Sequence, residues 1–126
     1  MAQGKTNRRK GHDHERREAK KFRELGYTFC KTSREASRLL DASKIDLAFI
    51  PFNVQIKAGY AKGLNYVTIF NAMLDALKEN FPPDDQIHSY PPVIIHNKGR
   101  TEEEKLVVMR KKDFYNMIEA NNETES

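Results

Sequence analysis

The chain has 126 residues, 38% of them hydrophobic and 32% charged, a length and composition that predict one domain with one modest core. Its only cysteine is Cys30, which excludes a disulfide scaffold and predicts a reducing compartment. No apolar run approaches the length of a membrane span, and the basic N-terminal segment lacks the apolar stretch of a secretory signal.

The net charge of +4 is distributed unevenly along the chain. Residues 1–34 carry a net charge of +7, residues 35–101 are neutral, and residues 102–126 carry −3. Clusters of lysine and arginine bind nucleic-acid phosphates without regard to base sequence. A solvated basic helix that keeps the protein soluble would explain the same charge, so composition alone leaves both interpretations open.

Three segments carry apolar residues at the spacing of an amphipathic helix. They are residues 11–25, 64–80 and 112–120. Gly26 ends the first of these helices. In the third, the spacing predicts that Phe114, Met117 and Ile118 face the core.

Five other segments are short and rich in apolar, aromatic or β-branched residues, which is typical of strands. They are residues 27–32, 44–50, 54–58, 92–96 and 105–109. Pro51 closes the second strand, and a tight turn at Phe52-Asn53 joins it to the third in a β-hairpin. The polar residues 33–43 have room for one short helical turn.

The order of elements is therefore α-β-β-β-α-β-β-α. This order predicts an α/β fold with a mixed central β-sheet flanked by helices. All of these elements fit in one domain over residues 10–120. Residues 1–9 are expected to form a flexible basic arm, and residues 121–126 a disordered tail.

The predicted hairpin combines three polar side chains with an otherwise apolar strand pair. Asp46 lies in its first strand, and Gln55 and Lys57 share one face of its second strand because side chains alternate along a strand. The turn brings Asp46 beside Gln55 or Lys57. Polar groups in such surroundings are costly unless they are paired or functional. The cluster is therefore either a buried Asp46–Lys57 salt bridge or a functional site.

The same residues suit metal-assisted hydrolysis of a phosphodiester. Mg²⁺ prefers oxygen ligands, which Asp46, the amide of Gln55 and the backbone carbonyl of Ile56 would supply. Glu15 on the first helix offers a further carboxylate. Lys57 would orient the attacking water or stabilise the charge that builds on the phosphate.

Four short motifs occur in sequence order within residues 8–58. They are Lys10-Gly11-x-x-x-Glu15, Gly26-Tyr27, Lys44-Ile45-Asp46-Leu47 and Val54-Gln55-Ile56-Lys57. This layout resembles the PD-(D/E)XK nuclease superfamily, and within it the small archaeal and phage Holliday junction resolvases. The resemblance implies a restriction-endonuclease-like core and a Mg²⁺-dependent endonuclease, with Mn²⁺ as a substitute, that cleaves branched DNA.

The resemblance also implies a role for each matched residue. Asp46 would be the main metal ligand, Lys57 the catalytic lysine, and Glu15 an acidic residue that contacts the metal directly or through water. Gln55 stands where the family usually has Glu or Asp, which removes one negative charge from the site. This departure keeps open a catalytically inactive DNA-binding or phage structural protein with the same fold. Another nuclease of the superfamily, of restriction or repair type, is a second alternative.

Partners follow from the same resemblance and from the charge distribution. The residues expected to contact DNA are Arg8, Arg9, Lys10, Arg16, Ser33, Arg34, Tyr60 and Lys62. A four-way junction has two-fold symmetry, so a homodimer would supply two matched sites. The 64–80 helix carries Tyr66, Phe70, Met73 and Leu77, most of which are expected to pack against the sheet, with the remaining part as the candidate dimer face. The expected compartment is the cytoplasm of a prokaryote or of a phage-infected host cell.

Two histidines invite a metal interpretation. His12 and His14 form a His-x-His pair, but positions two apart point to different helix faces, which favours a solvated helix end over a zinc site. His96 is expected to be a hydrogen-bonded core or edge residue, and Cys30 a small buried hydrophobe.

Overall fold

The computed structural model describes residues 2–59, 64–97, 99 and 101–125, with side chains from residue 11 to residue 122 of these. Its centre is a three-stranded mixed sheet of β3 (Asn53–Ala58), β4 (Pro92–Asn97) and β5 (Leu106–Met109). The strands lie in the order β3-β4-β5, with β3 and β4 parallel and β4 and β5 antiparallel. The prediction of a mixed sheet flanked by helices is thus confirmed at this level.

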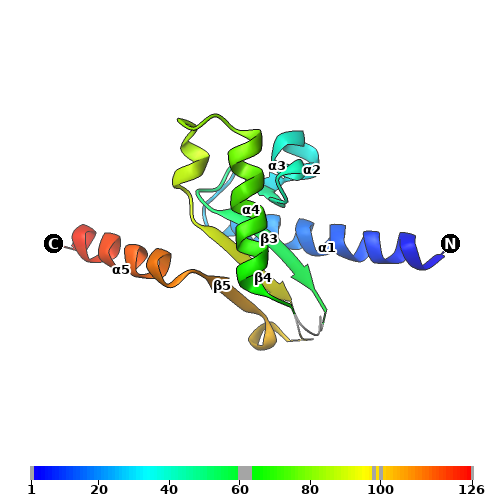
Figure 1. The fold of residues 1–126 in the computed structure, drawn as a ribbon. Helices are drawn as coiled ribbons and strands as arrows, with labels where there is room; N and C mark the ends of the chain where they lie inside the picture. The colour runs from blue at the N-terminus through cyan, green and yellow to red at the C-terminus, as the bar shows by residue number, and fades with distance from the viewer. Residues whose placement is uncertain (1, 60–63, 98, 100, 126) are drawn as a thin grey trace.

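Helices α1 (Ala2–Glu24) and α4 (Tyr66–Asn80) cover opposite faces of the sheet (Figure 1). The strand sequences dictate this arrangement, because neighbouring residues of a strand point to opposite faces. Val93 packs on the same side as Ala19 of α1, and Ile94 packs against α4. Every residue of β4 is buried, as expected for a central strand covered on both faces.

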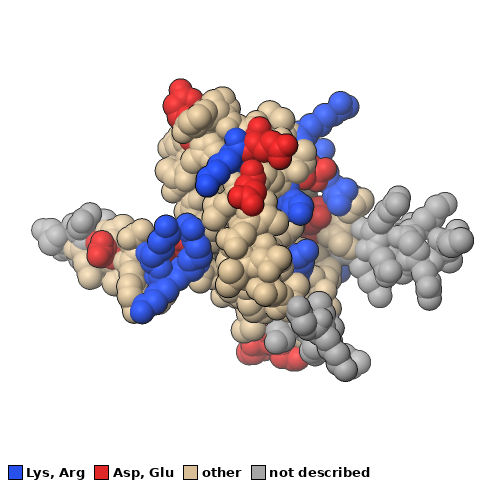
Figure 2. Space-filling model, viewed as in Figure 1, with Lys and Arg blue, Asp and Glu red and all other residues tan. Residues whose placement is uncertain are grey.

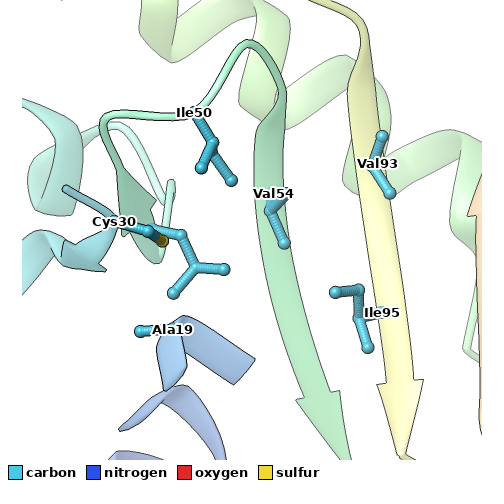
Figure 3. Packing of buried hydrophobic residues seen from close by; sticks show 7 residues of the cluster. Ala19, Cys30, Ile50, Val54, Val93 and Ile95 are labelled. Carbon is cyan, nitrogen blue, oxygen red and sulfur yellow. The ribbon is translucent and has the colours of Figure 1, made fainter. Parts of the chain in front are cut away.

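The α1 side of the core joins residues that are far apart in sequence (Figure 3). Val54 of β3 and Ile95 of β4 face Ala19, and the buried Cys30 lies beside them. The expectation that Cys30 is a small buried hydrophobe is confirmed. This packing anchors the second half of α1 against β3 and so positions the residues one turn earlier on α1.

The α4 side of the core contains most of the residues that the sequence assigned to core packing or a dimer face. Phe70, Met73 and Leu77 are buried against Ile45 and Ile94. The α4 helix starts where its Asn65 side chain accepts a hydrogen bond from the backbone N–H of Thr68 at 3.1 Å. These three side chains are therefore core residues, and they offer no surface to a second chain.

The predicted hairpin is wrong in its pairing. The first of its strands shortens to β2 (Leu47–Ala48), which pairs antiparallel with β1 (Lys31–Thr32) in a separate two-stranded sheet and not with β3. Lys44 and Phe49 both have φ near +65°, a conformation that interrupts an extended strand on either side of β2. The tight turn becomes a bend ahead of β3, which starts at Asn53.

The segment before β2 is also more helical than predicted. Residues 27–30 form a turn, in which the N–H of Cys30 donates to the carbonyl of Tyr27, and only Lys31 and Thr32 remain of the expected strand. Gly26, with φ of +118°, follows the end of α1 as its sequence position predicted. The polar segment contains two short helices, α2 (Ser33–Ala36) and α3 (Arg38–Ala42).

Both terminal helices are longer than predicted. The helix α1 begins at Ala2, so the residues assigned to a flexible basic arm are its first turns. The helix α5 (Lys111–Glu125) likewise includes nearly all of the expected tail. Apolar periodicity locates only the packed part of a helix, because elongation adds one hydrogen bond per residue whether or not the residue packs.

The orientation predicted for the last helix is wrong. Phe114, Met117 and Ile118 were expected to face the core, but each is exposed. Helix α5 projects away from the body of the protein, on the side opposite the start of α1 (Figure 1). Two 3₁₀ turns complete the fold, η1 (Gln86–Ser89) before β4 and η2 (Glu102–Glu104) before β5. Across the described ranges, no helix has the length and apolar character needed to cross a membrane.

The core assignment predicts a large contrast between two positions of α4. Met73 is fully buried, whereas Val67 is 65% exposed. We expect Met73→Ala to lower the free energy of unfolding by about 2–5 kcal/mol, because it removes buried methylenes and leaves a cavity. Val67→Ala, the matched control on the same helix, should change it by less than about 0.5 kcal/mol. Urea unfolding followed by circular dichroism measures both, and equal effects would contradict the assigned core.

Candidate functional site

Asp46 lies beside the outer edge of β3, immediately before β2. Its backbone N–H donates to the carbonyl of Val54 at 2.8 Å, and its side-chain Oδ2 accepts from the N–H of Ile56 at 2.7 Å. On its other side, the carbonyl of Asp46 accepts from the N–H of Ser33 at 2.8 Å. Asp46 therefore lies where a fourth strand would pair with β3, but its backbone makes only one hydrogen bond to β3. The side-chain carboxylate accepts the second hydrogen bond, from Ile56.

The alternation of β3 also aims a backbone carbonyl at this edge. The N–H groups of Asn53 and Gly59 donate to Pro91 and Asn97, next to and within β4, so the odd-numbered residues face β4. Val54 and Ile56 face the other way, toward Asp46. Because the N–H and C=O of one strand residue point to the same side, the carbonyl of Ile56 is directed toward the edge where Asp46 lies.

Lys57 and Gln55 lie on the α4 face of β3, opposite Val54 and Ile56. The charge of Lys57 reaches Asp46 and acts to lower the pKa of that carboxyl. Among the described residues, no ion pair joins these two side chains, so the salt-bridge alternative finds no support. Gln55 is half-buried and adjoins the cluster along β3, without a hydrogen bond to Asp46 or Glu15 among the interactions of the described residues.

Glu15 reaches the same place from α1. It lies one turn before Ala19, on the helix face that packs against β3, and is only 7% exposed. Its Oε2 accepts a hydrogen bond from the Nε of Arg34 at 3.1 Å. This bond raises the pKa of the Arg34 guanidinium, so the arginine is a fixed positive charge beside the two carboxylates.

These charges and the burial of the site change the pKa of the Asp46 carboxyl. Burial, opposed by the hydrogen bond from Ile56 and reinforced by the negative charge of Glu15, raises the pKa of the Asp46 carboxyl to about 7. Lys57 and Arg34 act in the opposite direction without reversing the shift. The charges of Glu15, Lys57 and Arg34 thus all reach Asp46, and Arg34 is bonded to Glu15. A titratable group shifted this far by burial and a like charge is typical of functional sites.

The donor set fits a hard divalent cation. Each carboxylate uses one oxygen in a hydrogen bond, which leaves Oδ1 of Asp46 and Oε1 of Glu15 as further acceptors. Among the described residues, no three His, Cys, Asp or Glu side chains gather in one group, so a cation here would take its other ligands from backbone oxygen and water. Two carboxylates and the carbonyl of Ile56, with water at the remaining positions, correspond to how Mg²⁺ is bound in proteins. The arrangement could therefore neutralise a cation and hold it beside a phosphate.

The expected DNA contacts have mixed outcomes. Arg16 is exposed and pairs with Asp13 at 3.2 Å, and Arg34 is half-exposed beside Glu15, so both can reach a phosphate. Ser33 is fully buried, and its hydroxyl has no hydrogen-bond partner among the described residues, so it does not face a DNA backbone. The side chains of Arg8, Arg9 and Lys10, and all of Tyr60 and Lys62, lie outside the described part of the chain.

Sequence reasoning named Arg16 as a DNA contact but missed two further cations beside it, Arg23 and Lys31. Arg16, Arg23 and Lys31 line a surface hollow of about 380 Å³ between α1 and β1, together with Thr28 and Thr32. Arg23 also donates to the carbonyl of Cys30 at 2.9 Å, which fixes its guanidinium. The spacing of Arg16 and Arg23, two helical turns apart on one face of α1, was the signal that could have indicated it. This hollow offers a second place for a phosphate near the Glu15–Arg34 pair.

The prediction for His96 is confirmed. It is buried, its Nε2 lies 3.0 Å from the carbonyl of Gly59, and its Nδ1 lies 2.9 Å from the hydroxyl of Tyr66. The carbonyl can only accept, so Nε2 carries the proton and Tyr66 donates to Nδ1. His96 therefore joins the end of β3, just after Lys57, to the first turn of α4.

In comparisons with protein-family models, with curated proteins and with solved structures, no match is significant. The residues and geometry of this chain alone carry the functional proposal.

The pKa of Asp46 predicts that the site costs stability. The unfolded chain releases this proton near pH 3.8 and the folded protein near pH 7, so the folded state binds more protons between these values. The stability of the metal-free protein should therefore fall as pH rises from about 4 to 7 and remain lower above that. We expect Asp46→Asn to raise the free energy of unfolding at pH 8 by about 2–4 kcal/mol, a gain that disappears toward pH 4.

Urea unfolding as a function of pH measures this difference. Asp75→Asn is the matched control, because Asp75 is an exposed carboxylate on α4. An Asp46→Asn variant that is no more stable than the wild type at pH 8 would show that Asp46 titrates as an ordinary surface carboxyl.

Proposed function

We propose that this chain is a metal-dependent endonuclease that hydrolyses phosphodiester bonds in branched DNA, in the manner of a Holliday junction resolvase. The observation that carries the proposal is Asp46 held at the outer edge of β3, where the charges of Glu15, Arg34 and Lys57 all act on its carboxyl. Two carboxylates with two cations beside them form a site that suits a divalent metal and a phosphate together.

The fold supports the finer assignment to a restriction-endonuclease-like core. An aspartate precedes the strand that carries the glutamine and lysine, and a helix-borne glutamate packs against the same strand. Helices α1 and α4 enclose the sheet from both faces. This is the arrangement that the PD-(D/E)XK resemblance implies for Glu15, Asp46, Gln55 and Lys57.

Each residue has a defined task in the proposed reaction. Asp46, Glu15 and the carbonyl of Ile56 would hold a Mg²⁺ or Mn²⁺ ion, which when bound supplies Lewis-acid stabilisation of the phosphate. Lys57 orients the attacking water or stabilises negative charge on the phosphoryl oxygens. Arg34 binds a phosphate oxygen once a cation competes for the carboxylate of Glu15. Gln55 takes the position of the usual acidic ligand and adds an uncharged oxygen.

The charge pattern supports a substrate recognised by shape. Over α4 the acidic and basic side chains are mixed (Figure 2), so that face provides no continuous basic surface. The cations of α1, α2 and β1, namely Arg16, Arg23, Arg34 and Lys31, instead lie on the side of the candidate site. Contacts of this type neutralise phosphates and do not read bases. A homodimer in the reducing cytoplasm of a prokaryote or phage-infected cell fits this proposal.

Cleavage of a labelled four-way junction in Mg²⁺ tests the site directly. Asp46→Asn and Lys57→Ala should each lower the rate at least about a hundredfold, because the first removes the charged ligand of the metal and the second removes the positive charge beside the phosphate. Gln55→Glu should keep cleavage, since it restores the acidic ligand. Asp75→Asn and Lys78→Ala, which change exposed residues of α4, are the matched controls and should cut at the wild-type rate.

The same assay distinguishes the alternatives. An Asp46→Asn protein that cuts like the wild type would refute the site. Junction binding without cutting in either Mg²⁺ or Mn²⁺ would favour the inactive DNA-binding protein, for which Gln55 and the Glu15–Arg34 ion pair already provide a physical reason. A panel of duplex, flap and four-way substrates separates a resolvase, which prefers the junction, from a restriction or repair nuclease.

A further inference from the structure

The C-terminal strand and helix expose an unusual amount of apolar surface. Six large side chains of β5 and α5 are between 42% and 67% exposed. They are Leu106, Val107, Phe114, Tyr115, Met117 and Ile118. Nothing within the described part of the chain covers them, and they occupy a span of only 13 residues.

Four of these side chains line one hollow, and Met117 and Ile118 follow Phe114 by three and four residues on the same face of α5. Leu106 and Val107 of β5 line the same hollow as Phe114 and Tyr115 of α5, with a volume of about 530 Å³. Strand β5 is the outer strand of its sheet, and α5 extends from it away from the body (Figure 1). We call this surface, formed by β5 and α5, the C-terminal face.

Helix α5 needs a partner to be stable. An isolated helix of 15 residues is marginal in water. The charges of α5 also oppose its dipole, because Lys111 and Lys112 lie in the first turn and Glu119 in the second half, and the last turn has no basic residue. Asp113 is the one acidic residue of the first turn, and it is already paired with Arg110 at 2.7 Å.

This charge order is complementary to itself. Figure 2 shows basic side chains gathered where β5 meets α5, and the sequence places them at Arg110, Lys111 and Lys112. When two copies of α5 pack antiparallel around a two-fold axis, the basic start of each helix lies against the acidic half of the other. The macrodipoles of the two helices then point in opposite directions, which is a favourable arrangement. A second copy of this chain therefore satisfies both the apolar side chains and the charges.

The area is of the right size for such a contact. Six side chains of this exposure present about 500 Å² of apolar surface per chain, against about 800 Å² per partner in a standard interface that includes a polar rim. The two lysines and Glu119 would provide that rim.

We propose that the C-terminal face is a homodimer interface, in which two copies of α5 pack antiparallel about a two-fold axis. The candidate nuclease site lies at the outer edge of β3, and the sheet order β3-β4-β5 puts the C-terminal face at the opposite edge. Dimerisation through β5 and α5 leaves both sites uncovered. The proposal stands on the exposed surface and its charges, independently of the nuclease activity.

The mass in solution tests the interface. Light scattering at micromolar concentration should give twice the chain mass of 14.6 kDa for the wild type. Ile118→Lys should raise the dimer dissociation constant about 30-fold or more, because it places a charge in the centre of the apolar stripe. Val67→Lys is the matched control, an exposed β-branched residue on α4, and should remain dimeric. A wild-type protein with the mass of one chain, or an Ile118→Lys protein as dimeric as the wild type, would overturn the proposal.

A cysteine cross-link tests the geometry without adding a charge. Cys30 is buried, whereas Met117 is 42% exposed. A cysteine introduced at position 117 is therefore the thiol that an oxidant can reach. Near a two-fold axis a residue meets its own copy, so Met117→Cys should form a disulfide-linked dimer under mild oxidation, and Val67→Cys should not. Equal cross-linking of the two variants would refute the antiparallel arrangement. Neither measurement uses DNA or metal, so the outcome is separate from that of the cleavage assay.

Discussion

The hydrogen bond from the N–H of Ile56 to the carboxylate of Asp46 closes the outer edge of β3 at 2.7 Å. A strand at this position leaves a row of backbone N–H and C=O groups without partners, and proteins rarely leave such an edge open. Here the chain pairs with β3 at Asp46 alone, and the next two residues, Leu47 and Ala48, pair with β1 instead. Beyond Val54, the carboxylate of Asp46 accepts the hydrogen bond from β3 that a neighbouring strand would otherwise accept. The carboxylate is thereby held against the strand that carries Gln55 and Lys57.

This arrangement has an electrostatic cost. The partly buried carboxylate of Asp46, between the buried Ile45 and Leu47 in sequence, is desolvated and feels the negative charge of Glu15, so its pKa rises to about 7. A protein selected only for stability would replace either group with an apolar residue, because burying a charge without full compensation is unfavourable. Arg34 and Lys57 offset the cost in part. The remaining imbalance is what a divalent cation would correct, and it connects the fold to the proposed chemistry.

The sequence was sufficient for the parts governed by local pattern. The period of Phe70, Met73 and Leu77 predicted α4, and the apolar run from Pro92 predicted β4. It was insufficient where a tertiary neighbour decides the outcome. The positive φ of Phe49 ends β2 after two residues, and no propensity of phenylalanine predicts that conformation. Phe114, Met117 and Ile118 have helical spacing, but spacing only defines a face and does not say what covers it.

The account depends on Asp46 being a desolvated carboxyl that a metal ion can recruit. Carboxyl carbon NMR of the ¹³C-labelled protein, titrated with acid in the absence and presence of millimolar Mg²⁺, measures this directly. The account predicts a pKa of about 7 for Asp46 without metal, and a lower pKa with shifted Asp46 and Glu15 resonances when Mg²⁺ is added. An Asp46 carboxyl that titrates near 3.8 and does not respond to Mg²⁺ would contradict it.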